Sequence, residues 1–171
     1  MQTKTPSASI TYNTDMVLPS ETNALNNLFG GELLARMDRA ASIAAGRHSG
    51  HVTVTASVNH VAFNKSVPLG SILAIEAKVS RAFTTSMEVY IDVWLEDRSN
   101  GTRIKANEAI YTFVAVDETG KPTKVPQLIP ETELEKERFN GALRRKQLSL
   151  VLAGKMKPKE ATELRALFMD A

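Results

Sequence analysis

The stretch that decides the fold is NALNNLFGGELLARMDRAASIAA, from Asn23 to Ala45. An asparagine-rich loop leads into a Phe-Gly-Gly turn, and the residues after the turn repeat with a helical period. On a helical wheel the apolar side chains gather on one arc: Leu33, Leu34, Met37, Ala40, Ala41, Ala44 and Ala45. The charged residues take the opposite arc: Glu32, Arg36, Arg39 and Arg47. We therefore expect one long helix with a buried apolar face, and Gly46 as its stop.

Asp38 is the exception, because it falls among the apolar residues of this wheel. A carboxylate on a buried face is costly unless it is paired, so Asp38 is a candidate functional residue, with a structural ion pair as the alternative. Gly30 and Gly31 place backbone N–H groups at the helix start, where a developing negative oxygen is favoured. The two glycines are either a plain turn or a pair of oxyanion donors.

After the helix, the hydrophobic period changes to that of strands. Apolar and polar residues alternate in four segments: Val52–Phe63, Ser71–Ala82, Met87–Glu96 and Arg103–Val116. No helix separates these segments, which argues for an antiparallel sheet. The fold class is therefore α+β, with the long helix laid across one face of a curled antiparallel sheet.

This domain is predicted to span residues 10–130, with a short strand between Ile10 and Leu18. Residues 1–9 are polar and are expected to be disordered. Residues 131–171 are expected to form a C-terminal helical extension, with helices over 131–152 and 157–170.

Composition excludes several classes of function. The 171 residues are 43% hydrophobic with a net charge of +2, which suits a globular domain and not a nucleic-acid binder. The absence of cysteine excludes a disulfide framework and a thiolate nucleophile, and the three histidines lack zinc-helix spacing, so no metal site is expected. The N-terminal sequence has no long apolar run, so we expect a cytoplasmic protein without a membrane partner.

The motif N-x-x-N-N-L-F-G-G-x-x-L-x-x-M-D, from Asn23 to Asp38, resembles the acyl-CoA thioesterases of the hotdog fold. It is most similar to the branch that includes short bacterial acyl-CoA hydrolases and the brain-type two-domain hydrolases. Three later segments are similar in the same order: Val61–Ser71, Arg81–Val89 and Ala109–Asp117. The resemblance covers roughly residues 10–127.

The resemblance implies a hotdog fold, in which an antiparallel sheet wraps around one central helix. It also implies hydrolysis of acyl-CoA to a fatty acid and free coenzyme A, by a homo-oligomer that is a dimer or an assembly of dimers, possibly a hexamer. Coenzyme A is then part of the substrate, and no separate cofactor is expected.

Helix geometry adds a constraint. Gly31 and Asp38 share a helix face but lie about 10 Å apart along the axis. Reacting groups must approach to about 3 Å, so one chain cannot hold a thioester at both. A second helix running antiparallel would bring its own Asp38 to the first helix start. We therefore expect a composite site at a two-fold interface, as in the family.

In this interpretation the N–H of Gly30 or Gly31 binds the oxyanion. Asp38 of the partner subunit acts as general base on water or attacks directly, and the sequence does not separate the two. Asn27 would hydrogen-bond the water or the carbonyl, with Asn23 and Asn26 as alternatives. The residues assigned to substrate and coenzyme A binding are Asn23, Phe29, Phe63, Lys65, Arg81, Thr84, Thr85 and Ser86.

The main alternative is a hotdog protein that binds acyl-CoA as a sensor without hydrolysing it. A hotdog dehydratase is a weaker candidate, because no histidine lies between Asn23 and Ala45. A purely structural dimer leaves the carboxylate of Asp38 unexplained. The preferred acyl length is not indicated by the sequence.

Overall fold

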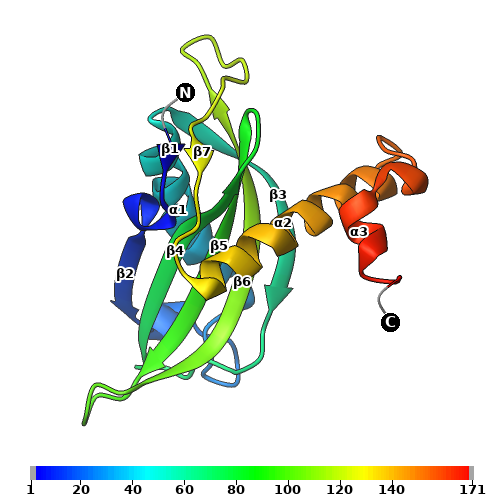
Figure 1. Ribbon diagram of the computed structural model, residues 1–171. Coiled ribbons are helices and arrows are strands. Elements are labelled where there is room, and N and C mark those ends of the chain that lie inside the picture. Colours follow the sequence, from blue (N-terminus) through cyan, green and yellow to red (C-terminus); the bar gives the residue numbers. More distant parts are fainter. Residues whose placement is uncertain (1–2, 170–171) are drawn as a thin grey trace. The chain divides into compact units, whose positions relative to one another are not determined.

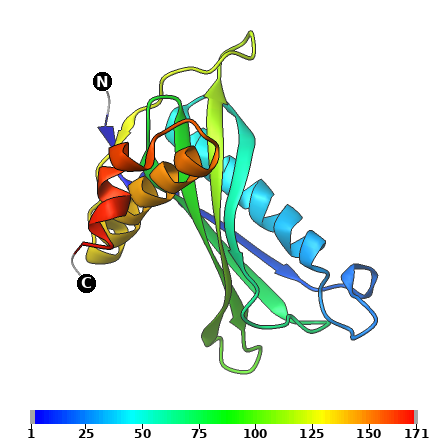
Figure 2. The same cartoon turned by 90° about the vertical axis from the view of Figure 1, so that its right-hand side faces the viewer.

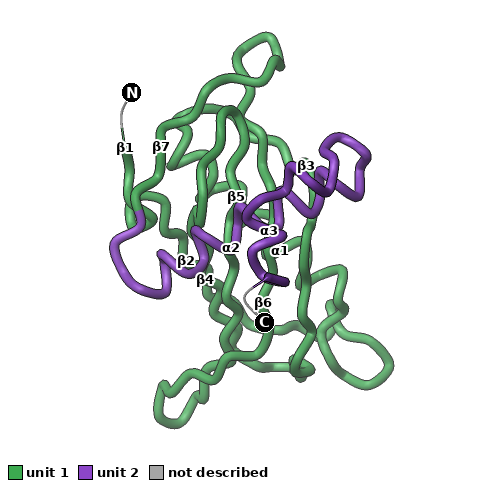
Figure 3. Tube along the Cα trace, turned by 45° about the vertical axis from the view of Figure 1, so that its right-hand side comes forward, with its two compact units in different colours: residues 1–129 green, residues 130–171 purple. Residues whose placement is uncertain are grey.

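The computed structural model describes residues 3–169, and Figure 1 shows its helices and strands. In chain order the elements are β1 (Thr3–Lys4), η1 (Pro6–Ser9), β2 (Thr11–Met16), η2 (Pro19–Glu21), α1 (Gly30–Ser49), β3 (Val52–Ala62), β4 (Ile72–Ala82), β5 (Ser86–Glu96), β6 (Arg103–Val116), β7 (Gln127–Leu128), α2 (Glu133–Leu152), η3 (Pro158–Glu160) and α3 (Thr162–Ala166). The elements labelled η are short 3-10 helices. The chain divides into two compact units, residues 1–129 and 130–171, coloured separately in Figure 3.

The first unit is one long helix against a five-stranded antiparallel sheet with the strand order β2-β4-β5-β6-β3. Figure 2 shows α1 running along the inner face of this curled sheet. Ala41, Ala44 and Ala45 of α1 are fully buried, and their small side chains let the helix approach the sheet closely. The α+β class predicted from the sequence is confirmed.

Two details of α1 differ from the sequence-based expectation. The helix continues past Gly46 and ends at Gly50, which takes a left-handed φ of 73° and donates its N–H to the Gly46 carbonyl at 2.8 Å. Arg36 was expected on the solvent arc, yet its side chain is only 2% exposed. Its guanidinium pairs with the Glu21 carboxylate at 2.7 Å, because the segment after β2 crosses this side of the helix.

The N-terminal segment also differs from the disorder expected over residues 1–9. Strand β1 pairs in parallel with β7, and the buried Ser9 hydroxyl accepts a hydrogen bond from the Val79 N–H at 2.9 Å. Lys4 donates to the last carbonyls of α1, at Arg47 and His48. The polar composition of this segment predicted disorder, but hydrogen bonds hold residues 3–9 in place. Residues 1–2 lie outside the described range.

Strand β3 forms one edge of the sheet and exposes three valines along its length. Val52 is 71% exposed, and Val54 and Val58 are each about half exposed. Exposed β-branched residues on an unpaired edge favour association with another strand.

The second unit begins with α2, whose N-terminus is closed by a capping box of Thr132 and Glu135. The Gln147 side chain accepts a hydrogen bond from the Leu164 N–H at 2.8 Å and so ties α3 to α2. The single helix expected over 157–170 is instead broken at Ala161, whose φ of −83° and ψ of 67° are not helical. Within residues 3–169, no helix is long and apolar enough to cross a membrane.

Candidate active site

The start of α1 presents open backbone donors. Phe29, at the N-cap, is extended with ψ of 137°, and no side chain of the described residues caps the helix. A Cβ at Gly31 would meet no described atom within 4 Å, and one at Gly30 would touch the Phe63 ring at 3.5 Å. The first N–H groups can therefore be approached closely by a ligand oxygen.

Hydrogen bonds of Glu21 fix the start of this helix. The Glu21 carbonyl accepts from the Phe29 N–H at 2.9 Å, while its carboxylate accepts from the Leu18 N–H at 2.8 Å and from Arg36. The Leu18 N–H and then the Arg36 guanidinium lower the pKa of Glu21. Since Arg36 itself belongs to α1, the hydrogen bonds of Glu21 connect the helix to the loop that precedes it.

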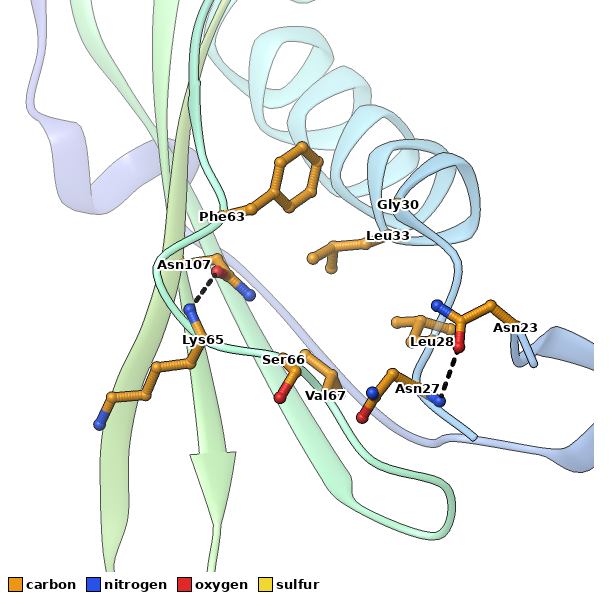
Figure 4. A pocket seen from close by; sticks show the side chains of 10 residues that line it. All are labelled: Asn23, Asn27, Leu28, Gly30, Leu33, Phe63, Lys65, Ser66, Val67 and Asn107. Carbon is orange, nitrogen blue, oxygen red and sulfur yellow. Dashed lines mark hydrogen bonds between the residues drawn. The ribbon is translucent and has the colours of Figure 1, made fainter. Parts of the chain in front are cut away.

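A pocket of about 320 Å³ lies beside Gly30, and Figure 4 shows the ten residues that line it. Its walls are the loop before α1, the β3–β4 loop and β6. The two loops are joined through their backbones, because the Leu28 N–H donates to the Val67 carbonyl and the Leu69 N–H donates to the Asn26 carbonyl, both at 2.8 Å. The pocket is thus held by main-chain bonds and lined by mixed apolar and amide side chains.

The asparagines before the helix take different positions. The Asn23 side-chain oxygen accepts from the N–H groups of Leu25 and Asn27, at 2.9 Å and 3.2 Å, which leaves its NH₂ group to face the helix start in Figure 4. The Asn27 side chain points instead toward Ser66. Asn26 adopts a left-handed φ of 55° at the loop turn. This geometry favours Asn23 over Asn27 as the donor to a carbonyl bound at Gly30.

Asp38 lies two turns further along α1 and is half-buried. Its carboxylate accepts a hydrogen bond from the Thr55 hydroxyl of β3 at 2.8 Å. Beneath it, the buried Tyr111 hydroxyl donates to the Leu34 carbonyl at 3.2 Å. Burial, and then the negative charge of Asp38, raise the pKa of Tyr111 to about 12, so the phenol stays neutral.

The structure therefore brings together some of the predicted residues and separates others. Asn23, Asn27, Gly30, Phe63 and Lys65 share the pocket, although the Lys65 ammonium points away from it in Figure 4. Phe29 and Gly31 adjoin it at the helix start. The carboxylate of Asp38 is about 10 Å along the helix axis from Gly31, so a single chain does not unite the two.

Of the residues proposed for coenzyme A binding, Arg81, Thr84, Thr85 and Ser86 lie at the other end of the sheet, whereas Lys65 lies at the pocket. Strand β4 begins after the pocket loop and runs for 11 residues, about 35 Å, before the β4–β5 hairpin that holds Thr84, Thr85 and Ser86. Arg81, near the end of β4, lies over the Phe83 ring at 5.7 Å. Within one protomer these residues do not approach Gly30.

Sequence reasoning missed Thr55 and Asn107. The alternating pattern of β3 put Thr55 on a polar strand face, which was the available signal, but not its contact with Asp38. Asn107 lines the pocket from β6 and is fully buried. Within residues 3–169, no three histidine, aspartate or glutamate side chains form a group that could hold a metal.

The fold and the site together define a hotdog-fold thioester hydrolase. Comparison with known proteins gives the family. A family model described as the thioesterase superfamily matches residues 25–102. YkhA of Bacillus subtilis, named an uncharacterized acyl-CoA thioester hydrolase, is 42% identical over 132 residues that span 77% of each chain. The chain therefore belongs to the acyl-CoA thioester hydrolase family of this superfamily.

Solved structures agree. An apo-hexameric acyl-CoA thioesterase superposes with a TM-score of 0.85 at 40% identity, covering 90% of this chain and 98% of that one. The Staphylococcus aureus acyl-CoA hydrolase, solved with butyryl coenzyme A and coenzyme A, gives a TM-score of 0.83 at 37% identity, covering 96% and 99%. Variants of the S. aureus enzyme replace an aspartate, an asparagine or a threonine with alanine.

Proposed function

We propose that the protein is a homo-oligomeric acyl-CoA thioesterase whose active sites are each built from two subunits. The observation that carries this proposal is the separation, on one helix, of the open donors at Gly30 and Gly31 from the carboxylate of Asp38. One protomer carries both the oxyanion donors and the carboxylate, but at two separate places. The donors therefore need the carboxylate of a second copy, and the carboxylate needs the donors of that copy.

The edge of the sheet formed by β3, together with α1, suits such a pairing. Val52, Val54 and Val58 on the β3 edge are exposed, as is Ile43, which is 50% exposed on α1. A two-fold axis beside α1 and β3 would bury these side chains and run the two helices antiparallel. The hexameric assembly of the solved relative supports an assembly of such dimers.

Hydrolysis would then proceed as follows. The thioester carbonyl accepts hydrogen bonds from the Gly30 and Gly31 N–H groups and from the Asn23 side chain. Asp38 of the second subunit, oriented by the Thr55 hydroxyl, takes a proton from water as the water oxygen attacks the carbonyl carbon. The tetrahedral oxyanion is stabilised at the helix start. Its collapse breaks the C–S bond, and the proton passes to the thiolate, which gives a carboxylic acid and free coenzyme A.

The S. aureus variants support these roles. Their asparagine and aspartate are separated by 15 positions, and their aspartate and threonine by 17. The same intervals separate Asn23, Asp38 and Thr55 in this chain. We therefore propose Asn23 for the role first predicted for Asn27, and keep Asn27 as a pocket-lining residue.

We also propose that the reaction needs no cofactor, since every group in this scheme belongs to the protein, water or substrate. Unchanged turnover after dialysis against EDTA would support this, and loss of turnover restored by a metal would contradict it. The cytoplasmic location stays a prediction, to be tested by fractionating the native host.

The composite site is tested by mixing two inactive variants. Asp38→Asn removes the base. Gly30→Pro removes one donor N–H at a position where proline fits the helix, because Phe29 is already extended. In a mixed dimer, one site keeps both functional halves. Randomly paired subunits should therefore recover about a quarter of wild-type turnover for a two-fold site.

Free thiol release from a series of acyl-CoA esters is the assay, and gel filtration shows that the variants stay assembled. The absence of cysteine keeps the background of a thiol reagent low. A mixture no more active than its parents would refute the composite site. A wild-type protein that binds acyl-CoA but hydrolyses none of the esters would refute the thioesterase function and leave the sensor.

A further inference from the structure

Asn107 lies on the inner face of β6, next to an irregularity in the strand. The pairing of β5 with β6 shifts between Val93 and Trp94, so that Val93 faces Asn107 while Trp94 faces Lys105. Ala106 is the extra residue of this β-bulge, and both Ala106 and Asn107 are buried, at 1% and 0% exposure. The bulge shifts the alternation of the residues that precede it in β6. Asn107 itself keeps the alternation of Ala109, Tyr111 and Phe113, which are all buried, so its amide points to the inner face and lines the pocket wall.

The orientation of this amide follows from its one hydrogen bond. The Lys65 N–H donates to the Asn107 side-chain oxygen at 3.3 Å, as Figure 4 shows. The oxygen therefore faces the β3–β4 loop, and Nδ2 faces the pocket. Among residues 3–169 this buried Nδ2 has no hydrogen-bond partner. A buried donor without an acceptor is costly, so its position calls for a ligand.

The residues that line the pocket indicate which kind of group can accept a hydrogen bond from Nδ2 of Asn107. Leu28, Leu33 and Val67 make much of its wall apolar, and Gly30 places it beside the expected thioester carbonyl. Lys65 is the charged residue among those that line it, and its ammonium points outward. The pocket therefore suits a short apolar chain that carries a neutral oxygen.

We propose that Asn107 is a specificity-determining residue whose Nδ2 donates a hydrogen bond to a neutral carbonyl or hydroxyl oxygen of the substrate near the thioester. This inference rests on the proposed thioesterase function. Two parts of an acyl-CoA can supply such an oxygen. One is the amide carbonyl nearest the sulfur on the thiol side, and the other is an oxo or hydroxyl group on the acyl chain.

The test uses Asn107→Asp, which keeps an oxygen acceptor for the Lys65 N–H but replaces the NH₂ donor. Asn107→Leu, which removes both groups, is the second variant if the buried carboxylate prevents folding. Gel filtration and thermal melting establish that each variant is assembled. Turnover is measured on two pairs of thioesters, and the readout is the ratio of kcat/KM within each pair.

The first pair is 3-hydroxybutanoyl-CoA and butanoyl-CoA, which differ in the acyl oxygen. The second pair is the butanoyl ester of N-acetylcysteamine and that of an amide-free thiol of equal length. Loss of a substrate hydrogen bond should lower the ratio of the oxygen-bearing to the oxygen-free ester about tenfold in one pair. The pair that responds identifies the source of the oxygen.

Other outcomes overturn the proposal. An equal loss on all four esters would make Asn107 a purely structural residue. Unchanged ratios in an active, assembled variant would show that Nδ2 contacts no substrate oxygen. These results would leave the thioesterase function intact, whereas wild-type protein that releases no thiol from any ester would refute that function and this inference with it.

Discussion

Replacement of Glu21 by alanine should destabilise the protein more than removal of its partner Arg36. The Arg36 side chain is 2% exposed and the Glu21 side chain 21% exposed. Removing Glu21 therefore leaves a buried charge without its partner, whereas removing Arg36 leaves a charge that water can partly solvate. Without Glu21, the partners left to the buried guanidinium among residues 3–169 are the Met16 carbonyl at 3.4 Å and the Asp15 carboxylate at 3.6 Å. Without Arg36, the Glu21 carboxylate is still reached by water and by the Leu18 N–H.

Breaking a buried ion pair by removing one partner costs about 3–5 kcal/mol, and the partial exposure of Glu21 places Glu21→Ala near the lower end, at about 3 kcal/mol. For a chain of this size that corresponds to a fall in Tm of about 6–12 °C. Arg36→Met replaces the buried charge with an apolar side chain and should cost about 1 kcal/mol. The double variant should therefore be more stable than Glu21→Ala alone.

Thermal unfolding at one fixed subunit concentration measures these differences, because the stability of an oligomer depends on concentration. Thiol release is measured in parallel, since the main-chain carbonyl of Glu21 accepts from the Phe29 N–H next to the helix start, and the substitution removes the side-chain bonds that fix this residue. If Glu21→Ala and Arg36→Met lower Tm equally, or if the double variant is less stable than Glu21→Ala, the idea of an uncompensated buried charge is wrong.

Three further predictions concern single side chains. Gly30→Pro should lower kcat by about 100–1000-fold through loss of an oxyanion donor, while Gly30→Ala, which keeps the N–H, should retain most activity; equal losses would point to obstruction of the pocket. Thr55→Val should lower kcat about tenfold by freeing the Asp38 carboxylate from its 2.8 Å hydrogen bond, and an unchanged kcat would exclude an orienting role. Burial lowers the pKa of His48, and this effect outweighs the hydrogen bond to the Pro126 carbonyl, which raises the pKa. The neutral imidazole is therefore favoured in the folded state. Its stabilising contribution should be complete above pH 6.5, the ordinary pKa, and fall as the pH drops below it; His48→Gln should reduce this fall in melts between pH 7.5 and 5, and an unchanged pH profile would contradict the assignment.

The layout of the fold was predictable from periodicity alone. The apolar arc of α1 and the four alternating segments are local patterns, and their order without intervening helices leaves few arrangements other than a helix on an antiparallel sheet. The hydrophobic wheel failed at Arg36, because it contains no information on the segment from another part of the chain that carries Glu21. The sequence also predicted the helix to end at Gly46. A glycine within a helix and a glycine at its C-terminus differ only in the packing around them, which the sequence does not show.

The candidate site was partly predictable for the same reason. Gly30 and Asp38 stand out from their neighbours in the sequence, since each departs from the local pattern. Thr55 looks like any polar residue on a strand, and only the proximity of β3 to α1 gives it a role. Asn107 alternates in phase with Ala109, Tyr111 and Phe113, so the pattern places it on the inner face of β6 but does not show that it lines a pocket.

The main-chain bonds between the two pocket loops have a consequence for how the pocket of this enzyme can change by substitution. Leu28 and Val67, and Leu69 and Asn26, are joined through peptide groups that every amino acid but proline can supply in full. Substitution at neighbouring positions such as Phe63 or Ser66 can therefore reshape the cavity without dismantling its frame. A change at these side chains can therefore alter which acyl groups fit, while the main-chain frame of the pocket stays the same.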